Sequence, residues 1–297
     1  MYIDLNAHQR YVEQTFSRKN IRARILNELN AEPTYHDVVE QSVKAVSDWL
    51  DGDYYQAKND RLAQLANRDL TKIVNDIYVE TMQIEKAQLF TSVVGQIASV
   101  LGMSDKIDGT KTAGELLAVI CNFDMYDIFK ENKYGSMHLV SNFSLSARTK
   151  EFIERTKYLP PMVVEPNVVS KNFDNAYLTE PSSLILGKGT HHDNDICLDS
   201  INKFNEVPLT LNTRLLTKLS ERPKKDFAEP DKKEQWLRFV NDSYEVYKDL
   251  IQVGNSIWLT HKVDSRGRTY AQGYHVSTQG NEFRKAIVEF ADKEVIS

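Results

Sequence analysis

The stretch that decides the fold reads Lys262-Val263-Asp264-Ser265-Arg266-Gly267-Arg268-Thr269-Tyr270. Residues two apart on an extended strand lie on the same face, so an extended segment would place Asp264, Arg266, Arg268 and Tyr270 on one side. That side would carry one carboxylate, two guanidiniums and one phenol. The pattern therefore predicts a strand with a polar face on which positive charge prevails.

This face suits an anionic polymer. A carboxylate beside an arginine fixes the guanidinium through charge-assisted hydrogen bonds, which gives Asp264 an orienting role. Two planar, permanently charged groups on one rigid strand match a nucleic-acid backbone, and we expect Arg266 and Arg268 to bind it. Gly267 removes a side chain where another backbone could come close. The alternative is an ordinary solvated ladder of cross-strand ion pairs.

The composition indicates a globular protein with one anion-facing region. The chain has 297 residues, of which 41% are hydrophobic and 27% charged, values that are typical of soluble domains. Its net charge of -5 argues mildly against a free-standing DNA-binding module. Positive charge nevertheless prevails within 214–226 and within 262–285. This asymmetry favours one surface that faces an anion.

Cysteine usage and the N-terminus indicate the compartment. Cys121 and Cys197 lie far apart in sequence and form no disulfide framework. The N-terminal residues contain no apolar signal core, and no apolar run approaches membrane-spanning length. We therefore expect a soluble protein of a reducing cytoplasm.

The first half of the chain has the periodicity of helices. Apolar residues recur three or four positions apart, Gly102 is placed to end a helix, and Thr112 with Glu115 predicts a capping box at a helix start. The expected helical stretches are 7–29, 38–50, 62–77, 80–101 and 145–157.

The second half is mixed. Residues 158–196 hold four of the eight prolines and predict loops with short extended pieces. Alternation after residue 256 predicts strands, so the fold class is α+β and predominantly α. The remaining expected elements are a helix over 198–220 broken at Pro208, a linker over 221–231, a helix over 232–253, and strands near 257–263, 267–275 and 285–290.

Four ordered landmarks resemble the single-subunit, phage-type RNA polymerases, a family that includes the mitochondrial enzymes. The motif Asp264-x-Arg266-Gly267-Arg268-x-Tyr270 is followed by Gln279-Gly280-Asn281, Lys285 and Phe290-Ala291, as in a segment of that family. The Asp264 motif and the segment from Gln279 to Ala291 are two of the landmarks, and Leu159-Pro160-Pro161-Met162-Val163 is similar to a third. Asn202, Pro208 and Asn212 to Leu216 are similar to a fourth. The resemblance covers roughly residues 158–297, and Ser277-Thr278 stands where the family has a proline before Gln-Gly.

The resemblance implies a division of the chain by role. It implies a helical N-terminal domain over 1–205, with an irregular segment over 158–196, then thumb-like helices over 206–256 and the start of a palm over 257–297. The basic residues Lys218, Arg222, Lys224 and Lys225 would lie along the upstream hybrid, and the alternative for the run 222–225 is a solvated linker. The expected nucleic-acid-binding residues are Arg266, Arg268, Tyr270, Lys285, Lys262 and Arg284, with Asp264 orienting one arginine and Gly267 and Gly280 allowing close approach of a backbone.

The family's catalytic groups have no counterpart here. In the family, two aspartates that hold divalent metal ions and a lysine on a fingers helix all follow the Asp264 segment. The resemblance therefore implies no catalytic and no metal-binding residue in this chain. It implies the N-terminal subunit of a heterodimeric phage-type DNA-dependent RNA polymerase, in the cytoplasm of an infected host cell. The larger partner subunit would carry the fingers, the aspartates and bound magnesium, and the DNA template and RNA transcript would be further partners.

Two other functions remain open. One is a non-enzymatic nucleic-acid-binding accessory factor for transcription, and the other is a helical scaffold without a nucleic-acid role. The run from His191 to Asp195 contains potential metal ligands. Adjacent residues do not easily converge on one ion, so we interpret this run as a polar surface loop.

Overall fold

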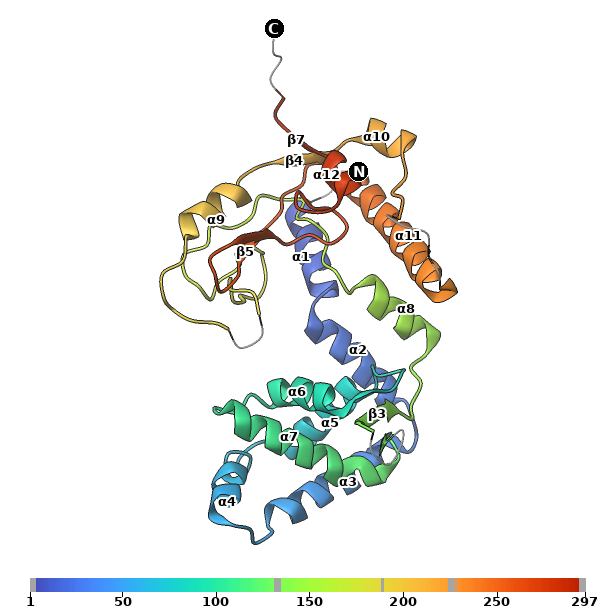
Figure 1. The fold of residues 1–297 in the computed structure, drawn as a ribbon, viewed down its shortest axis with the longest axis vertical. Coiled ribbons are helices and arrows are strands. Elements are labelled where there is room, and N and C mark those ends of the chain that lie inside the picture. The colour runs from blue at the N-terminus through green and yellow to red at the C-terminus, as the bar shows by residue number, and fades with distance from the viewer. Residues whose placement is uncertain (1–3, 131–134, 188–189, 224–226, 228, 294–297) are drawn as a thin grey trace. The chain divides into compact units, whose positions relative to one another are not determined.

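Helices dominate the computed structural model, which describes residues 4–130, 135–187, 190–223, 227 and 229–293 (Figure 1). The fold is α+β and predominantly α, as predicted. Contacts divide the chain into two compact units. We call Arg18–Ile153 the helical unit, and Met1–Ser17 with Glu154–Ser297 the hairpin unit. The predicted ranges 1–205, 206–256 and 257–297 divide the chain by role and stay predictions. No helix within the described ranges combines the length and apolar content needed to cross a membrane.

The helical unit packs its amphipathic helices around one core. Residues three to four apart, such as Val39, Ser42 and Val46, are buried on one side of α3, in line with the predicted periodicity. Helix α6 ends as predicted at Gly102, whose φ of 56° suits glycine. The elements are α2 (Arg18–Asn30), α3 (Tyr35–Leu50), α4 (Gln56–Ala63), α5 (Leu70–Thr81), β1 (Gln88–Leu89), α6 (Phe90–Leu101), α7 (Lys106–Ile120), the 3-10 helix η1 (Cys121–Phe123), β2 (Tyr126–Lys130) and β3 (Met137–Ser141), with α8 (Ala147–Arg155) crossing the boundary between the units.

Three predicted helices are interrupted. The stretch 62–77 begins with the end of α4, passes through turns over 64–69 and becomes helical again at Leu70 in α5. The stretch 7–29 forms α1 (Leu5–Thr15) and α2, because the Ser17 hydroxyl donates to the Gln14 carbonyl at 2.7 Å and closes the first helix locally. The stretch 80–101 begins with the end of α5, passes through β1 and becomes helical again only at Phe90. All three predictions of continuous helix were therefore wrong at the breaks.

The predicted capping box at Thr112 was wrong. Thr112 and Glu115 lie inside α7, where their side chains accept hydrogen bonds from a buried arginine. Helix α7 is capped by Asp105, whose carboxylate accepts the Asp108 N–H at 2.8 Å. The Arg61 side chain is 2% exposed, and it donates to Thr112 Oγ1 at 2.9 Å and to Glu115 Oε1 at 2.7 Å. A buried guanidinium needs such partners, so this ion pair ties α4 to α7.

The helical unit also contains a small antiparallel sheet that the periodicity did not predict. Its order is β1-β3-β2, with Leu139 of β3 opposite both Gln88 and Ile128. Leu139 is buried in the same core as the helices. The strands are short, and part of the connection between β2 and β3 lies outside the described residues.

The hairpin unit combines helices with two short antiparallel ladders, β4 with β7 and β5 with β6, among the described residues. The predicted helix over 232–253 is confirmed as α11, and the predicted helix over 198–220 is broken as expected at Pro208. A strand that was not predicted follows that proline. The elements are α1, α9 (Leu198–Asn205), β4 (Leu209–Leu211), α10 (Thr213–Lys218), α11 (Pro230–Gln252), β5 (His261–Val263), β6 (Thr269–Ala271), α12 (Glu282–Ala286) and β7 (Val288–Phe290).

Side chains of α1 bind the irregular segment that follows residue 158. The Gln9 side chain accepts the Val163 N–H at 2.9 Å, and Glu13 accepts the Leu178 N–H at 3.1 Å. Arg10 donates to the Leu178 carbonyl at 2.9 Å. These bonds satisfy backbone groups that a segment without regular structure would otherwise leave unpaired. They explain why the first helix belongs to the hairpin unit.

Candidate nucleic-acid interface

The motif around Asp264 folds into a tight hairpin. Strands β5 and β6 pair antiparallel with Lys262 opposite Tyr270. The Asp264 carbonyl accepts the Gly267 N–H at 2.9 Å, and the Asp264 N–H donates to the Arg268 carbonyl at 2.9 Å. Gly267 has a φ of 79°, the left-handed conformation that ends a three-residue hairpin loop. The prediction that one extended face carries Asp264 to Tyr270 was therefore wrong, because the chain reverses between two strands. The strands themselves lie within the predicted ranges 257–263 and 267–275.

The polar residues of this motif meet at the Asp264 carboxylate and not along one face of a strand. Its Oδ1 accepts the backbone N–H groups of Arg266 at 2.9 Å and Arg268 at 3.0 Å. Its Oδ2 accepts from Arg268 Nε at 2.8 Å and lies 2.6 Å from Arg268 Nη2. The Tyr270 hydroxyl reaches the same oxygen at 3.5 Å. The four polar residues of the motif thus gather around one carboxylate.

Electrostatics keep this carboxylate charged. The backbone hydrogen bond from Arg268 is the largest of several interactions that lower the pKa of Asp264 to about 2, followed by the Arg268 side chain and the Arg266 N–H. Burial opposes the shift without cancelling it. Asp264 is therefore ionised at neutral pH and holds Arg268 as a charged pair.

The two arginines differ in how firmly they are held. The Arg268 side chain is 55% exposed and bonded to Asp264, and its guanidinium lies 5.7 Å from the centre of the Tyr270 ring. The Arg266 side chain is 73% exposed, and its Nε is 3.7 Å from Asp264 Oδ2. At that distance the interaction is a loose ion pair and not a hydrogen bond. Both guanidiniums lie at the exposed end of the hairpin, where an anion can reach them.

The remaining predicted cations have different surroundings. Lys285 is exposed on α12. Lys262 points inward, where its ammonium donates to Ser182 Oγ at 2.9 Å and to the Ser183 carbonyl at 2.8 Å, and burial lowers its pKa. Lys218 and Arg222 are exposed, whereas Lys224 and Lys225 lie outside the described residues. A role in binding nucleic acid stays a prediction for each of these residues.

Arg284 is mostly buried, unlike a surface contact residue. Its side chain is 18% exposed, and its Nε lies 3.3 Å from Oε1 of Glu221, whose side chain is 2% exposed. Its Nη1 donates to the Tyr274 carbonyl at 2.8 Å, and the guanidinium covers the Phe239 ring at 4.4 Å. These contacts connect α12, α11 and the loop that follows β6.

The two predicted glycines serve the chain itself in different ways. No atom of the described chain lies within 4 Å of where a Cβ on Gly267 would be, so its conformation accounts for the glycine. A Cβ on Gly280 would come within 2.9 Å of Arg284 Cβ, so the close neighbour there is a side chain. Close approach of a nucleic-acid backbone to either glycine stays a prediction.

Several residues of the polymerase-like landmarks hold the chain together through amide side chains. Gln279 accepts the Ala271 N–H at 3.0 Å and donates to the Thr269 carbonyl at 3.1 Å, so it pairs with β6 as a strand would. The Asn202 side chain likewise accepts the Val169 N–H and donates to the Val169 carbonyl. The Asn212 side chain caps α10 by accepting the Leu215 N–H. The spacing did not reveal these roles, because each partner is a distant or irregular backbone segment.

The landmarks meet in one part of the molecule. Val163, Leu209, Leu211 and Ile287, which belong to or directly adjoin three of them, are buried in one core with Ile257. Strand β4 pairs with β7 on one side, and Leu209 bridges to Ile257 on the other. The remaining landmark, the Asp264 hairpin, joins this core through Ala271 of β6, which packs against it and is hydrogen-bonded by Gln279. Segments that are widely separated in sequence therefore form one structural module.

No known protein-family description matches the chain. A comparison with curated proteins finds a probable DNA-directed RNA polymerase of Agaricus bitorquis, 28% identical over 170 residues that cover 46% of this chain. This similarity supports a relation to RNA polymerases. The chain spans 15% of the length of that polymerase.

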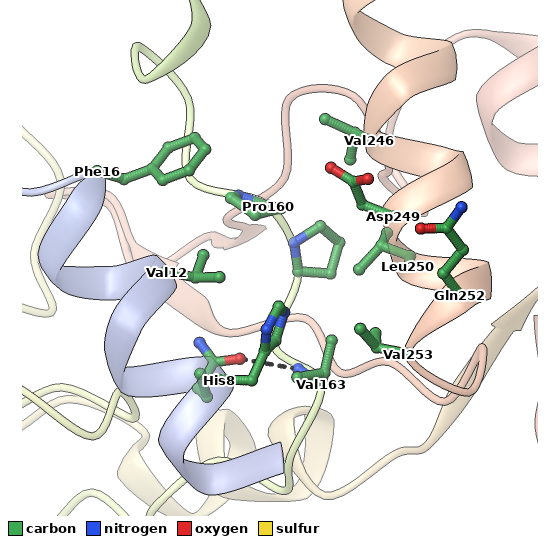
Figure 2. Close-up of a pocket in the computed structure, with 12 residues that line it drawn as sticks. His8, Val12, Phe16, Pro160, Val163, Val246, Asp249, Leu250, Gln252 and Val253 are labelled. Atoms are coloured by element: carbon green, nitrogen blue, oxygen red, sulfur yellow. Dashed lines mark hydrogen bonds between the residues drawn. The ribbon is translucent and has the colours of Figure 1, made fainter. Parts of the chain in front are cut away.

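A pocket of about 290 Å³ lies within the hairpin unit, apart from the predicted contact residues (Figure 2). Its walls are α1, the Pro160–Pro161 segment and the last turns of α11. Val12, Val163 and Leu250 make much of the lining apolar, and the Gln9–Val163 hydrogen bond crosses one end. None of the nine predicted site residues lines it.

The His191 run has the contacts of a polar loop. His191 Nδ1 lies 3.0 Å from Ser183 Oγ, and its Nε2 lies 3.4 Å from Asp193 Oδ1. Across the described ranges, no three His, Cys, Asp or Glu side chains are arranged to hold a metal ion. The magnesium expected of a polymerase therefore has no fitting donor set among these residues.

Proposed function

We propose that this chain is the N-terminal subunit of a heterodimeric phage-type DNA-directed RNA polymerase. It would contact the DNA template and the RNA–DNA hybrid, while a larger partner subunit would supply the fingers, the catalytic aspartates and the magnesium that they bind. In this assignment α11 is a short thumb, and the β5–β6 hairpin with β7 begins the palm. The site of action would be the cytoplasm of the infected host cell.

One observation carries the proposal: the four polymerase-like landmarks fold into a single module that presents two arginines beside an ionised aspartate. The relation to a DNA-directed RNA polymerase supports it independently. A hybrid offers two phosphate backbones, and an exposed guanidinium binds phosphate without reading sequence, as transcription of any template requires. Arg266 would bind as the looser group and Arg268 as the group oriented by Asp264.

Reconstitution tests the assignment. We expect the chain, co-expressed with a protein that carries the family's catalytic aspartates and fingers lysine, to give magnesium-dependent RNA synthesis that neither protein shows alone. Full activity of that second protein by itself would contradict the proposal. The isolated chain binding hybrid while adding nothing to catalysis would instead favour an accessory factor.

Matched variants connect the activity to the hairpin. Arg266→Ala with Arg268→Ala should lower hybrid affinity and reduce the dependence of that affinity on salt by about two phosphate contacts. Arg148→Ala removes an exposed arginine from α8, outside the predicted site, and is the control. Equal effects of the hairpin pair and the control would remove the hairpin from the proposed interface.

A further inference from the structure

Two tyrosines of the hairpin unit form a stacked pair near the surface. Tyr158 precedes the Pro160–Pro161 segment, and Tyr274 lies in the loop after β6. Their ring centres are 3.4 Å apart with an angle of 10° between the planes. Tyr274 is 38% exposed and Tyr158 is half-buried. The pair therefore presents aromatic surface to solvent and does not lie wholly in the core.

The loop that carries Tyr274 is held on several sides. Arg284 donates to the Tyr274 carbonyl at 2.8 Å, and the Tyr247 hydroxyl donates to the His275 carbonyl at 3.0 Å. The His275 ring hydrogen-bonds Ser243 Oγ at 2.8 Å and stacks on Phe239. A ring fixed this way loses little conformational freedom when a ligand stacks on it, so less binding free energy is lost to ordering.

The charges around the pair nearly balance. The Lys157 ammonium is exposed and lies 5.7 Å from the centre of the Tyr158 ring. Arg155 is exposed nearby in sequence and interacts electrostatically with Asp242, while Arg238 pairs with Glu234 and Glu154 is exposed beside Arg155. The Arg284 guanidinium lies 5.7 Å from the centre of the Tyr274 ring, but it is mostly buried and paired with Glu221. Lys157 is then the cation best placed to meet a phosphate, and the aromatic surface supplies most of the attraction.

We propose that the Tyr158–Tyr274 pair binds an unpaired nucleobase of single-stranded nucleic acid, with Lys157 contacting the adjoining phosphate. Every nucleobase has a flat π face, so stacking on an aromatic ring tolerates any sequence. Bases in a duplex or hybrid already stack on one another and do not offer that face. The inference rests on the proposed function only in taking nucleic acid as the ligand, and it adds a second site to the Asp264 hairpin.

The test measures binding of the full chain to fluorescent hexanucleotides, one of RNA and one of DNA, and to a hybrid of matching sequence. Tyr274→Leu and Tyr158→Leu keep apolar bulk without the ring and should weaken hexamer binding about tenfold, or about 1.4 kcal/mol, because they remove the stacking of a base on an aromatic ring. Tyr274→Phe should bind as the wild type does. Tyr55→Ala, which removes a tyrosine that is 68% exposed in the helical unit, is the matched control.

The salt dependence of hexamer binding counts the phosphate contacts, and the comparison of RNA with DNA shows which strand is bound. With one phosphate contact, the slope of log affinity against log salt should be about −0.7 for the hexamers. A loss on RNA alone identifies the transcript as the ligand, a loss on DNA alone identifies the template strand, and equal losses indicate either strand. Circular dichroism and thermal unfolding check that the leucine variants remain folded.

Several outcomes would overturn the inference: wild-type affinity of Tyr274→Leu for both hexamers, an equal loss on the hybrid, or no saturable hexamer binding by the wild type. Its failure is distinguishable from failure of the proposed function. If the tyrosine variants change nothing while Arg266→Ala with Arg268→Ala weakens hybrid binding, only the stacking site is wrong. If the arginine variants change nothing while the tyrosine variants lose hexamer binding, only the hairpin assignment is wrong.

Discussion

Asp264 holds Arg268 twice, since Oδ1 accepts the backbone N–H at 3.0 Å and Oδ2 accepts the side-chain Nε–H at 2.8 Å. One carboxylate therefore sets both the shape of the loop and the direction of a guanidinium. Any contribution of Arg268 to binding an anion depends on Asp264, and the two residues should behave as one unit in a double-mutant cycle.

We predict that Asp264→Asn weakens hybrid binding as much as Arg268→Ala does, and that the double variant weakens it little further. The asparagine amide can still accept from the backbone, but its NH₂ group would face the donors of Arg268. Fluorescence anisotropy with a labelled hybrid measures the four affinities. Additive losses in the double variant would mean that Asp264 and Arg268 act separately.

The sequence predicted helices best where one face is continuously apolar. Val39, Val46, Tyr247 and Leu250 follow the 3.6-residue period, and each is buried on its helix as expected. Strand β4 has only three residues and is stabilised by β7 and Ile257, both distant in sequence. Short strands of this kind carry too little periodicity to be recognised without their partners.

The candidate site was predicted in its residue types but not in its geometry. A turn signal was present, because an aspartate at the first position and a glycine at the fourth are typical of a type I turn, and Asp264 and Gly267 have that spacing. Alternation of polar residues suggested a strand instead. The burial of Arg284 could not be foreseen, since Glu221 lies far back in the sequence and nothing local marks the two as a pair.

Arg284→Ala, which removes the guanidinium, should destabilise the hairpin unit. Glu221 would keep a buried charge without its counter-ion, a loss of about 3 kcal/mol in the free energy of unfolding. Urea unfolding in a Trp49→Phe background reports on this unit, because Trp236 and Trp258 are the remaining tryptophans. Lys285→Ala, at the exposed neighbour on α12, should change stability by less than about 0.5 kcal/mol.

A second variant separates charge from packing at this pair. Replacing Glu221 by Gln together with Arg284→Met removes both charges and should recover part of the stability lost in Arg284→Ala. If the double variant is less stable than Arg284→Ala, the ion pair is not what stabilises this part of the molecule.

Three glycine-to-alanine changes should differ in sign and size. In Gly273→Ala the new Cβ would overlap the Val276 carbonyl oxygen, which belongs to backbone and cannot easily move, so we expect a loss of about 3 kcal/mol or more. Gly267→Ala forces a left-handed conformation with no overlap, at a cost of about 1–2 kcal/mol. Gly95→Ala lies within α6, where a Cβ meets no atom within 4 Å, and should stabilise by about 0.5–1 kcal/mol.

Thermal unfolding of the three variants provides the comparison. Gly267→Asn adds a further check, because asparagine tolerates the left-handed region better than alanine does. Equal losses in Gly267→Ala and Gly273→Ala would contradict the structure of the loops that carry them.

Acid should weaken the hairpin unit between about pH 6.5 and pH 4. Burial lowers the pKa of His261 to about 4, and burial with the nearby Arg284 charge lowers the pKa of His275 to about 4. Both are near 6.5 in the unfolded chain, so the unfolded state binds more protons within this window. Their stabilising contribution is therefore complete above about pH 6.5 and is lost as the pH falls toward 4, by up to about 1.4 kcal/mol per pH unit for each histidine.

Urea unfolding of the Trp49→Phe background at pH 7, 6 and 5 measures this slope. The slope of the unfolding free energy against pH measures how many more protons the unfolded state binds than the folded state. His275→Gln should therefore reduce this slope by the equivalent of up to one proton, even if the variant is less stable at every pH. His261→Gln should do the same, and the double variant should remove both contributions. His36→Gln, in the helical unit, is the control. A slope that is unchanged in the double variant would show that other groups titrate in this window and that the two histidines are not buried as the structure has them.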